Sequence, residues 1–293
     1  MTEQNTRLGV MLMVLTMFIF AMQDGISRHL AGEYNVYMVI MIRYWVFASF
    51  VILWSARTAG GLSKVIRSAQ PKLQFFRGAL LALEVIVMVI GFVKLGLVES
   101  HAMFATYPLI ITALSGPLLG ERVGWRRWMS VALGFIGVLI ILMPGSGVWS
   151  MAAIFPLGSA AMFALYGLLN RYVARRDPAS VTFFYTGISG AIVTTIIGVW
   201  FWETMTFGDW AWMALLCATS TFGHYLLIRA YELSEASAIQ PFAYLQLVFA
   251  SMLGVIVFHD VIRLNVAIGT SLVVAAGMFA LLRARKVAEQ RTP

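Results

Sequence analysis

Residues 20–28 read FAMQDGISR, and residues 163–171 read FALYGLLNR. Each segment places Phe-Ala within a long apolar stretch and ends on an arginine that follows a polar residue, Ser27 in one copy and Asn170 in the other. A match of this kind inside one chain indicates an internal duplication.

Further matched residues follow in the same order and strengthen the duplication. They are Glu99 with Glu235, Ala102 with Ala238, and Glu121 with Asp260. After the last pair, small, large and small side chains recur at helical spacing, at Ser130, Leu133 and Gly137 and again at Gly269, Leu272 and Ala276. Small residues at this spacing let two helices approach closely in a membrane. The alternative is that apolar helices resemble one another through composition alone.

The composition indicates that most of the chain lies in lipid. Apolar residues make up 60% and charged residues 12% of the 293 residues, and this charged fraction is roughly half that of a soluble domain. Several stretches are long enough to cross the hydrocarbon core as helices, which takes ~20 residues each. We expect ten such spans, at 9–30, 36–56, 73–93, 99–119, 125–144, 150–172, 180–202, 208–230, 236–257 and 263–283. The predicted fold is all-α and integral to the membrane.

The number of crossings determines how the two copies are related. Because five is odd, the second copy must cross the membrane in the opposite sense to the first. We therefore predict two inverted five-helix repeats, residues 1–144 and 145–293. Inverted repeats are typical of carriers that bind their substrate near the mid-plane, where the repeats meet.

The Lys and Arg residues fall mainly on one side of the membrane. If the N-terminus is cytoplasmic, 17 of the 21 face the cytoplasm, three (Arg28, Lys94 and Arg263) face the other side, and Arg43 falls within a span. This bias predicts that both termini are cytoplasmic. The net charge of +8 is therefore a topology signal, and no nucleic-acid partner is expected. The first span is too long for a signal peptide and is expected to remain as a helix.

Three polar residues within the spans are candidates for function, because lipid does not tolerate them unpaired. Glu84, near the middle of the third span, could contact a substrate amine or exchange a proton; alternatively it is structural, neutral or paired with Arg43 or Arg77. Arg43 is expected to be structural, because a guanidinium can satisfy several carbonyls. His224 in the eighth span could change its charge near neutral pH; alternatively it stays neutral and bonds to a neighbour.

Two further predicted spans contain a proline in corresponding halves, Pro108 in the fourth and Pro241 in the ninth. Proline removes a backbone donor and allows a kink, and interrupted helices in both halves indicate a mid-plane site. Polar and aromatic residues near these prolines and on the first and sixth spans complete the predicted substrate site. The site residues are Glu84, His101, Tyr107, Tyr166, His224, Gln240, Tyr244 and Gln246, and the residues expected to couple or gate transport are Asp24, Glu84, His224, Pro108 and Pro241.

The chain resembles the drug/metabolite transporter superfamily, in its ten-helix form with two EamA-type domains. The resemblance rests on Arg43, Gly120-Glu121, Gly134, Gly137, Ala238, the segment 241–245 (PFAYL), Phe258 and Asp260. The second copy has His259-Asp260 where Gly-Glu is usual in this superfamily, so the acidic position need not have one fixed role. In length and in its general sequence pattern the chain is similar to bacterial amino-acid and metabolite exporters, including aromatic-amino-acid exporters of the YddG type.

This resemblance implies a secondary transporter in the bacterial cytoplasmic (inner) membrane, a multi-pass protein that exports small metabolites by alternating access. The expected substrate is an amino acid, aromatic ones included, or a related metabolite, and the expected partners are that substrate and membrane lipid. A monomer, no cofactor and no metal are expected. The alternative is a channel or a lipid or other-metabolite translocator of the same superfamily. An intramembrane enzyme is disfavoured, because the four histidines are scattered and no nucleophile or metal motif is present.

Overall fold

The computed structural model describes residues 6–57, 61–119, 124–142, 151–233 and 240–289. All regular secondary structure in these ranges is helical. The α-helices are α1 (Thr6–Glu33), α2 (Val36–Arg57), α3 (Gly61–Ile66), α4 (Pro71–Leu95), α5 (Leu97–Phe104), α6 (Tyr107–Leu119), α7 (Trp125–Ile141), α8 (Ile154–Val173), α9 (Ala179–Gly198), α10 (Phe207–Leu233), α12 (Leu245–Phe258) and α13 (Leu264–Glu289). Short 3₁₀ helices are η1 (Met151–Ala153), η2 (Val199–Phe201) and η3 (Gln240–Tyr244).

These helices carry the predicted spans in the predicted order. Six segments of the described chain are long and apolar enough to cross a membrane: Arg7–Glu33, Val36–Arg57, Pro71–Leu95, Leu97–Leu118, Met151–Val173 and Ala179–Phe201. Shorter apolar helices are Trp128–Ile141, Phe242–Phe258 and Leu264–Phe279. The basic loop expected at 57–72 contains a short helix, α3, that the sequence did not indicate.

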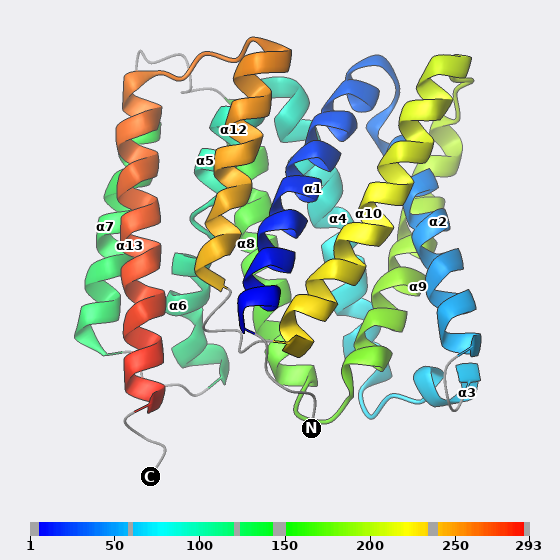
Figure 1. Cartoon of the computed structure of the whole chain (residues 1–293), viewed down its shortest axis with the longest axis horizontal. Coiled ribbons are helices and arrows are strands. Elements are labelled where there is room, and N and C mark those ends of the chain that lie inside the picture. The colour runs from blue at the N-terminus through cyan, green and yellow to red at the C-terminus, as the bar shows by residue number, and fades with distance from the viewer. Residues whose placement is uncertain (1–5, 58–60, 120–123, 143–150, 234–239, 290–293) are drawn as a thin grey trace.

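The helices run alternately up and down in the bundle (Figure 1). Helix α1 begins, and α13 ends, at the lower edge of this view, which is called the terminal side below. The opposite edge, where α1 and α12 end, is called the far side. Each helix of the second half runs opposite to its counterpart in the first: α1 ascends in Figure 1, whereas α8 descends.

The packing of the helices has the symmetry expected of inverted repeats. Helix α1 packs against α10, and exchanging each for its counterpart gives the pair α8 and α4, which also pack together. Three further pairs join a helix directly to its own counterpart: α2 to α9, α5 to α12, and α7 to α13. The two halves are therefore interleaved, and their shared interface runs through the middle of the bundle.

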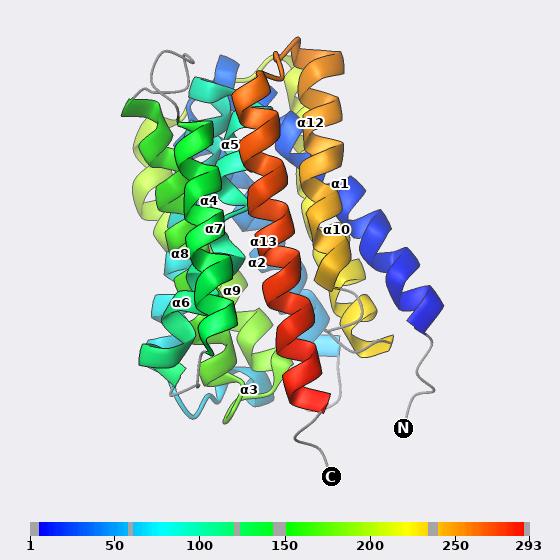
Figure 2. The same ribbon diagram turned by 90° about the vertical axis from the view of Figure 1, so that its left-hand side faces the viewer.

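The pair formed by α7 and α13 lies side by side at one end of the bundle in both Figure 1 and Figure 2. Gly137 and Gly269 are at the crossing. A β-carbon added to Gly137 would lie 2.7 Å from the carbonyl oxygen of Gly269, and one added to Gly269 would lie 2.5 Å from that of Gly137. Only glycine allows this approach, so the predicted role of these small residues in close packing is confirmed.

The fourth predicted span is two helices rather than one. Helix α5 ends at Phe104 and α6 begins at Tyr107, directly before Pro108. The corresponding point of the second half is where η3 ends at Tyr244 and α12 begins. Both halves are thus irregular at the same depth, and in the first half the missing N–H of the proline contributes to the break.

Helix α4 is fixed to the second half by Arg77, which is fully buried. The guanidinium donates to Asn170 Oδ1 at 2.7 Å, to the carbonyl oxygen of Thr182 at 2.6 Å and to Thr186 Oγ1 at 2.8 Å. It also donates to Gln74 Oε1 at 3.2 Å. These acceptors lie on α4, α8 and α9, so Arg77 joins three helices and is structural.

Candidate functional site

Two adjoining cavities lie between the halves. The inner cavity has a volume of about 160 Å³ and is lined by α1, α2, α4, α5, α8, α9, α10 and α12. The vestibule has a volume of about 370 Å³ and is lined by α1, α5, α6, α8, α10, η3 and α12. The residues that border both are Phe20, His101, Phe104, Phe163 and Gln246. The two cavities therefore adjoin, and together they form the candidate site.

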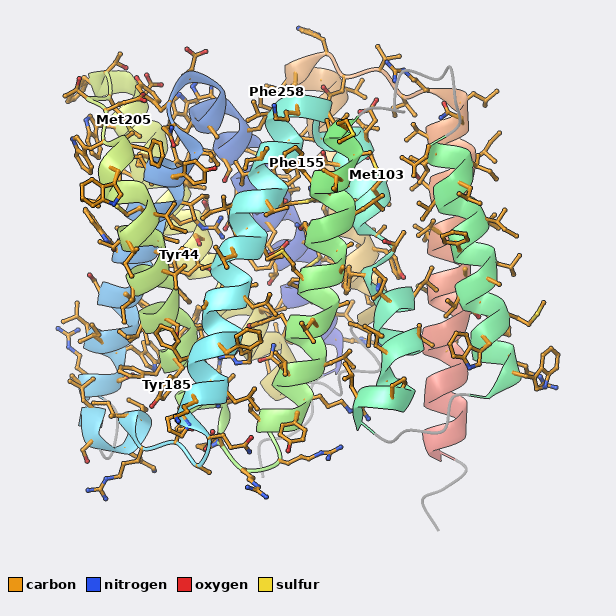
Figure 3. All side chains as sticks on the ribbon, turned by 180° about the vertical axis from the view of Figure 1, so that it is seen from behind. Tyr44, Met103, Phe155, Tyr185, Met205 and Phe258 are labelled. Carbon is orange, nitrogen blue, oxygen red and sulfur yellow. The ribbon has the colours of Figure 1, made fainter. Side chains whose placement is uncertain are left out.

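The inner cavity lies near the middle of the membrane-spanning helices. Tyr44, one of its lining residues, is about halfway between the two sides of the bundle in Figure 3. The vestibule lies nearer the terminal side, because its lining includes Met13 near the start of α1 and Asn170 near the end of α8. A path from the terminal side to the mid-plane thus passes through the vestibule.

Charged and titratable side chains are concentrated on the wall of the inner cavity. They are Asp24, Arg43, Glu84, His101 and His224, contributed by α1, α2, α4, α5 and α10. The first four are buried. Both signs of charge are present, so this wall can bind a molecule that carries both a cationic and an anionic group.

Asp24 is buried and joins three helices that surround the site. Its Oδ2 accepts a hydrogen bond from Gln246 Nε2 on α12 at 2.9 Å. His101 Nε2 on α5 lies 3.1 Å from the same oxygen, outside hydrogen-bond geometry, so this contact is an ion pair only when the imidazole is protonated. The three predicted site residues Asp24, His101 and Gln246 thus meet at one point of the wall.

Glu84 borders the same cavity from α4 and accepts a hydrogen bond from the hydroxyl of Ser159 on α8. The structural hypothesis for this carboxylate named Arg43 or Arg77 as its partner. Within the described ranges neither arginine forms an ion pair with it. Arg43 instead donates from Nε to Ser220 Oγ at 2.9 Å, and Arg77 is bound as described above. A hydroxyl group, not a cation, therefore holds Glu84.

His224 contacts its own helix and the aromatic wall. Its Nδ1 lies 2.8 Å from the carbonyl oxygen of Ser220, one turn earlier in α10. Its ring is 5.1 Å from that of Phe20 and 5.4 Å from that of Phe47. Both a neutral and a protonated ring can donate from Nδ1 to a carbonyl, so both alternatives for His224 stay predictions.

The vestibule has an aromatic wall centred on Phe163. The ring of Phe163 lies 4.9 Å from Tyr107, 5.3 Å from Phe104 and 5.8 Å from Tyr166. Tyr244 borders the same space from the second half. Ring separations of this size are those of interacting aromatic pairs, so the wall can contact a planar or apolar group of a bound molecule.

The structure brings the predicted site residues together, with two exceptions. Glu84 and His224 border the inner cavity, Tyr107, Pro108, Tyr166 and Tyr244 border the vestibule, and the other described candidates are placed above. The side chains of Gln240 and Pro241 lie outside the described residues. Sequence reasoning named the tyrosines of this lining but not its phenylalanines or Ser220, and its expectation that Arg43 is structural stays a prediction. Among these residues, only the polar ones in the middle of a span could have been found from the sequence, because polar residues are unusual there.

On the far side polar contacts join the two halves. Arg28 on α1 donates to Asp260 Oδ2 at 2.8 Å, and the guanidinium also lies over the ring of Phe258, 4.3 Å from its centre. The same carboxylate oxygen accepts from the backbone N–H of Leu97 at 2.9 Å. Phe258 is near the far edge of the bundle in Figure 3.

The second contact on the far side is formed by Asp209, at the start of α10. Its carboxylate accepts from the hydroxyl of Tyr34 at 2.7 Å, and His29 Nε2 lies 3.4 Å from its other oxygen. Together with the Arg28–Asp260 pair, this contact joins the two halves on the far side, whereas the vestibule lies toward the terminal side.

Comparison with known proteins identifies the family and the fold. The model of the EamA-like transporter family matches residues 7–143 and 150–282. One curated relative is an S-adenosylmethionine uptake transporter of Rickettsia prowazekii (strain Madrid E), 22% identical over 278 residues that cover 95% of this chain and 94% of the relative. A riboflavin transporter of Vibrio cholerae serotype O1 is 24% identical over 277 residues, 92% of each chain.

An exporter is also among the relatives. The pseudopaline exporter CntI of Pseudomonas aeruginosa (strain UCBPP-PA14) is 23% identical over 281 residues, 95% of this chain and 97% of the relative. A solved crystal structure superposes with a TM-score of 0.64 at 17% sequence identity, covering 98% of this chain and 99% of that one. At this identity the superposition shows a shared fold.

Proposed function

Because the chain belongs to the EamA-like transporter family, and is thus a multi-pass membrane transporter of small molecules rather than an enzyme, we propose that it exports amino acids or amino-acid-like metabolites. Transport would occur by alternating access. The substrate would bind in the inner cavity and reach it through the vestibule. The conformation described here would be the one open toward the terminal side.

The observation that carries this proposal is the chemistry of the inner cavity. Buried basic and acidic groups, Arg43, Asp24 and Glu84, border one space together with aromatic rings. A zwitterion with an apolar side chain complements such a site, because each of its charges would meet an opposite charge away from water. The aromatic wall of the vestibule favours substrates with a flat or bulky side chain, and aromatic amino acids fit this description.

The distribution of basic residues supports an orientation. The terminal side has the larger share of Lys and Arg, and such an excess marks the cytoplasmic side. We therefore assign the terminal side to the cytoplasm and the membrane to the bacterial inner membrane. The vestibule would then admit substrate from the cytoplasm, as an exporter requires.

The experiment that tests this proposal is counterflow in proteoliposomes. Purified protein is reconstituted with unlabelled solute inside, and accumulation of labelled solute is measured for aromatic, aliphatic, acidic and basic amino acids, with S-adenosylmethionine and riboflavin as further members of the panel. Saturable accumulation stimulated by internal amino acid supports the proposal. Accumulation only with riboflavin, non-saturable flux typical of a channel, or scrambling of labelled lipid would each contradict it.

A further inference from the structure

Arg43 differs from the other buried arginine in having few partners. Only 7% of its surface is exposed, and it lies within α2 at the depth of the inner cavity. Its Nε donates to Ser220 Oγ at 2.9 Å. Within the described ranges, the ion pairs involve Arg28, His29 and His101, and none involves Arg43.

Arg77 provides the comparison within the same protein. Its guanidinium makes four hydrogen bonds, to Gln74, Asn170, Thr182 and Thr186. A buried guanidinium has five N–H donors and is stable in a low-dielectric environment only when acceptors surround it. Arg77 meets this condition with protein groups. Arg43 has a neutral hydroxyl as its hydrogen-bond acceptor and borders an open space.

The geometry of the cavity indicates what occupies that space. Arg43 is the sole Lys or Arg among the described residues lining either cavity, and two carboxylates, Asp24 and Glu84, border the inner cavity as well. A guanidinium binds a carboxylate through two parallel hydrogen bonds. A phosphate dianion would need further fixed cations and would be repelled by the two acids. A single carboxylate is therefore the anion that matches this wall.

We propose that Arg43 binds the carboxylate of the transported molecule, and that the acidic wall formed by Asp24 and Glu84 binds its cationic group. Ser220 acts as a positioning residue. Its hydroxyl accepts the hydrogen bond from Arg43 Nε, so the two terminal nitrogens of the guanidinium stay available for the carboxylate. This inference rests on the proposed transport function and adds the chemical group that the substrate must carry. It replaces the structural role expected for Arg43.

The test compares amino acids with their carboxamides. Phenylalanine, methionine and lysine, each with its amide, are titrated into purified protein by a thermal-shift binding assay and used as competitors in the counterflow assay. In the wild type the acids should bind and compete more strongly than the amides by roughly tenfold to a hundredfold, the range expected for losing a hydrogen bond to a charged group. Equal binding of acids and amides would overturn the proposal without any mutant.

The Arg43→Gln variant extends the test. Binding of the acids should fall by roughly tenfold or more, and the preference for acid over amide should disappear. Arg57→Gln is the matched control, because it removes an exposed guanidinium from the end of the same helix; it should behave as wild type. A folded Arg43→Gln protein that keeps the acid preference contradicts the assignment.

Two further variants keep the test decisive if Arg43→Gln does not fold. Arg43→Lys keeps the positive charge but cannot form two parallel hydrogen bonds to a carboxylate, so it should lower the preference for acids over amides. Ser220→Ala should raise KM for the acids more than it lowers kcat, with recovery in Ser220→Thr. Unchanged preference and KM in both would overturn the proposal. If the protein binds the acids in preference to the amides but shows no counterflow, the Arg43 site is supported and the transport proposal is refuted. If it shows counterflow without a preference for the acids, transport is supported and the Arg43 site is refuted.

Discussion

Arg28 of α1 and Asp260, just after α12, form an ion pair of 2.8 Å that joins the two halves of the chain on the far side. The position of Asp260 depends on glycine. A β-carbon on Gly96, whose φ is +90°, would lie 2.8 Å from the carboxylate, and one on Gly254 would lie 2.7 Å from it. Since the vestibule lies toward the opposite side, this pair is a contact that must break for the far side to open.

The first prediction is that Asp260→Asn favours the state open to the far side. Asparagine keeps the size of the side chain but loses its charge, and a loss of ~1 kcal/mol would change the conformational equilibrium roughly fivefold. The measurement uses a single cysteine at Gln23, which lines the inner cavity, in a Cys217→Ser background. In Asp260→Asn, a membrane-impermeant thiol reagent added on the far side should label this cysteine roughly fivefold faster than in the parent protein.

The control for this prediction is Glu203→Gln, which removes an exposed carboxylate in the segment between η2 and α10. Its labelling rate should equal that of the parent. Arg28→Gln should reproduce the effect of Asp260→Asn, because either change breaks the same pair. Unaltered labelling rates in both Asp260→Asn and Arg28→Gln would show that this ion pair does not limit opening of the far side.

The second prediction concerns Glu84. Glu84→Gln can still accept the hydrogen bond from Ser159, so the fold should be kept while the ionisable carboxyl group on the cavity wall is lost. Initial rates of counterflow should fall by roughly tenfold or more for substrates with a cationic group. Circular dichroism and size-exclusion chromatography report whether the variant is folded. Full activity in the folded variant would remove Glu84 from the site.

The third prediction links Tyr244 to Gly277 on α13. The hydroxyl of Tyr244 occupies the space where a side chain at Gly277 would begin, and within the described residues it has no hydrogen-bond partner. Gly277→Ala should therefore push the ring toward the vestibule, destabilise the protein by ~1–3 kcal/mol through overpacking and slow transport. Unfolding in detergent and counterflow measure the two effects.

A double-mutant cycle tests this contact directly. In a Tyr244→Ala background the space is free, and Gly277→Ala should be neutral or stabilising by up to ~1 kcal/mol, as expected for a helix interior. Tyr244→Ala should also impair transport in its own right. An identical effect of Gly277→Ala in both backgrounds would show that the two residues do not interact.

The fourth prediction is that a larger residue at the α7–α13 crossing separates these helices. Gly137→Leu places a side chain where the carbonyl oxygen of Gly269 already lies at 2.7 Å from the added β-carbon, so the free energy of unfolding should fall by ~1–3 kcal/mol or more. Gly124→Leu is the control, because nothing lies within 4 Å of a β-carbon there. Equal stabilities of the two variants would contradict the close approach.

Much of the fold could be predicted from the sequence because its determinants are local. An apolar stretch of about 20 residues becomes a helix across a membrane, and the repeat then relates the halves. The spacing of small residues predicted that the helices of Gly137 and Gly269 pack closely on a neighbour, although it did not indicate that they pack on each other. The break between α5 and α6 was expected from Pro108, although the short helix α3 was not, because a six-residue helix in a basic loop has no distinctive pattern.

The site was predictable only in part, because its contacts depend on the relative depth of different helices. Mid-span polarity identified Asp24, His101 and Glu84, but not that Asp24 and His101 meet while Glu84 bonds to Ser159. The role of Arg43 depends on which acceptors surround it, and sequence does not contain that information. The sequence indicated the tyrosines of the aromatic wall but not its phenylalanines, because 20 phenylalanines are spread over the chain and nothing distinguishes Phe163 from those that face lipid.

The fifth prediction concerns Asp177, in the loop between α8 and α9. Burial by itself raises the pKa of this carboxyl, but hydrogen bonds from Ser68, Gln74 and the backbone N–H of Ala69 outweigh it and hold the pKa below its usual value. These bonds fix the segment before α4 to the second half. Asp177→Asn should lower the free energy of unfolding at pH 7 by ~2 kcal/mol, the scale of hydrogen bonds to a charged group.

The sign of the pH dependence follows from the lowered pKa. An unfolded aspartate titrates near 3.9, so the stability that Asp177 contributes is fully present above about pH 4 and is lost as the pH falls through the lower folded value. The difference between wild type and Asp177→Asn, measured by denaturant unfolding in detergent micelles, should therefore be constant from pH 7 to pH 5 and shrink toward pH 3. A difference that instead grew on acidification would mean that Asp177 is more readily protonated in the folded protein, and the proposed hydrogen-bond network would be wrong.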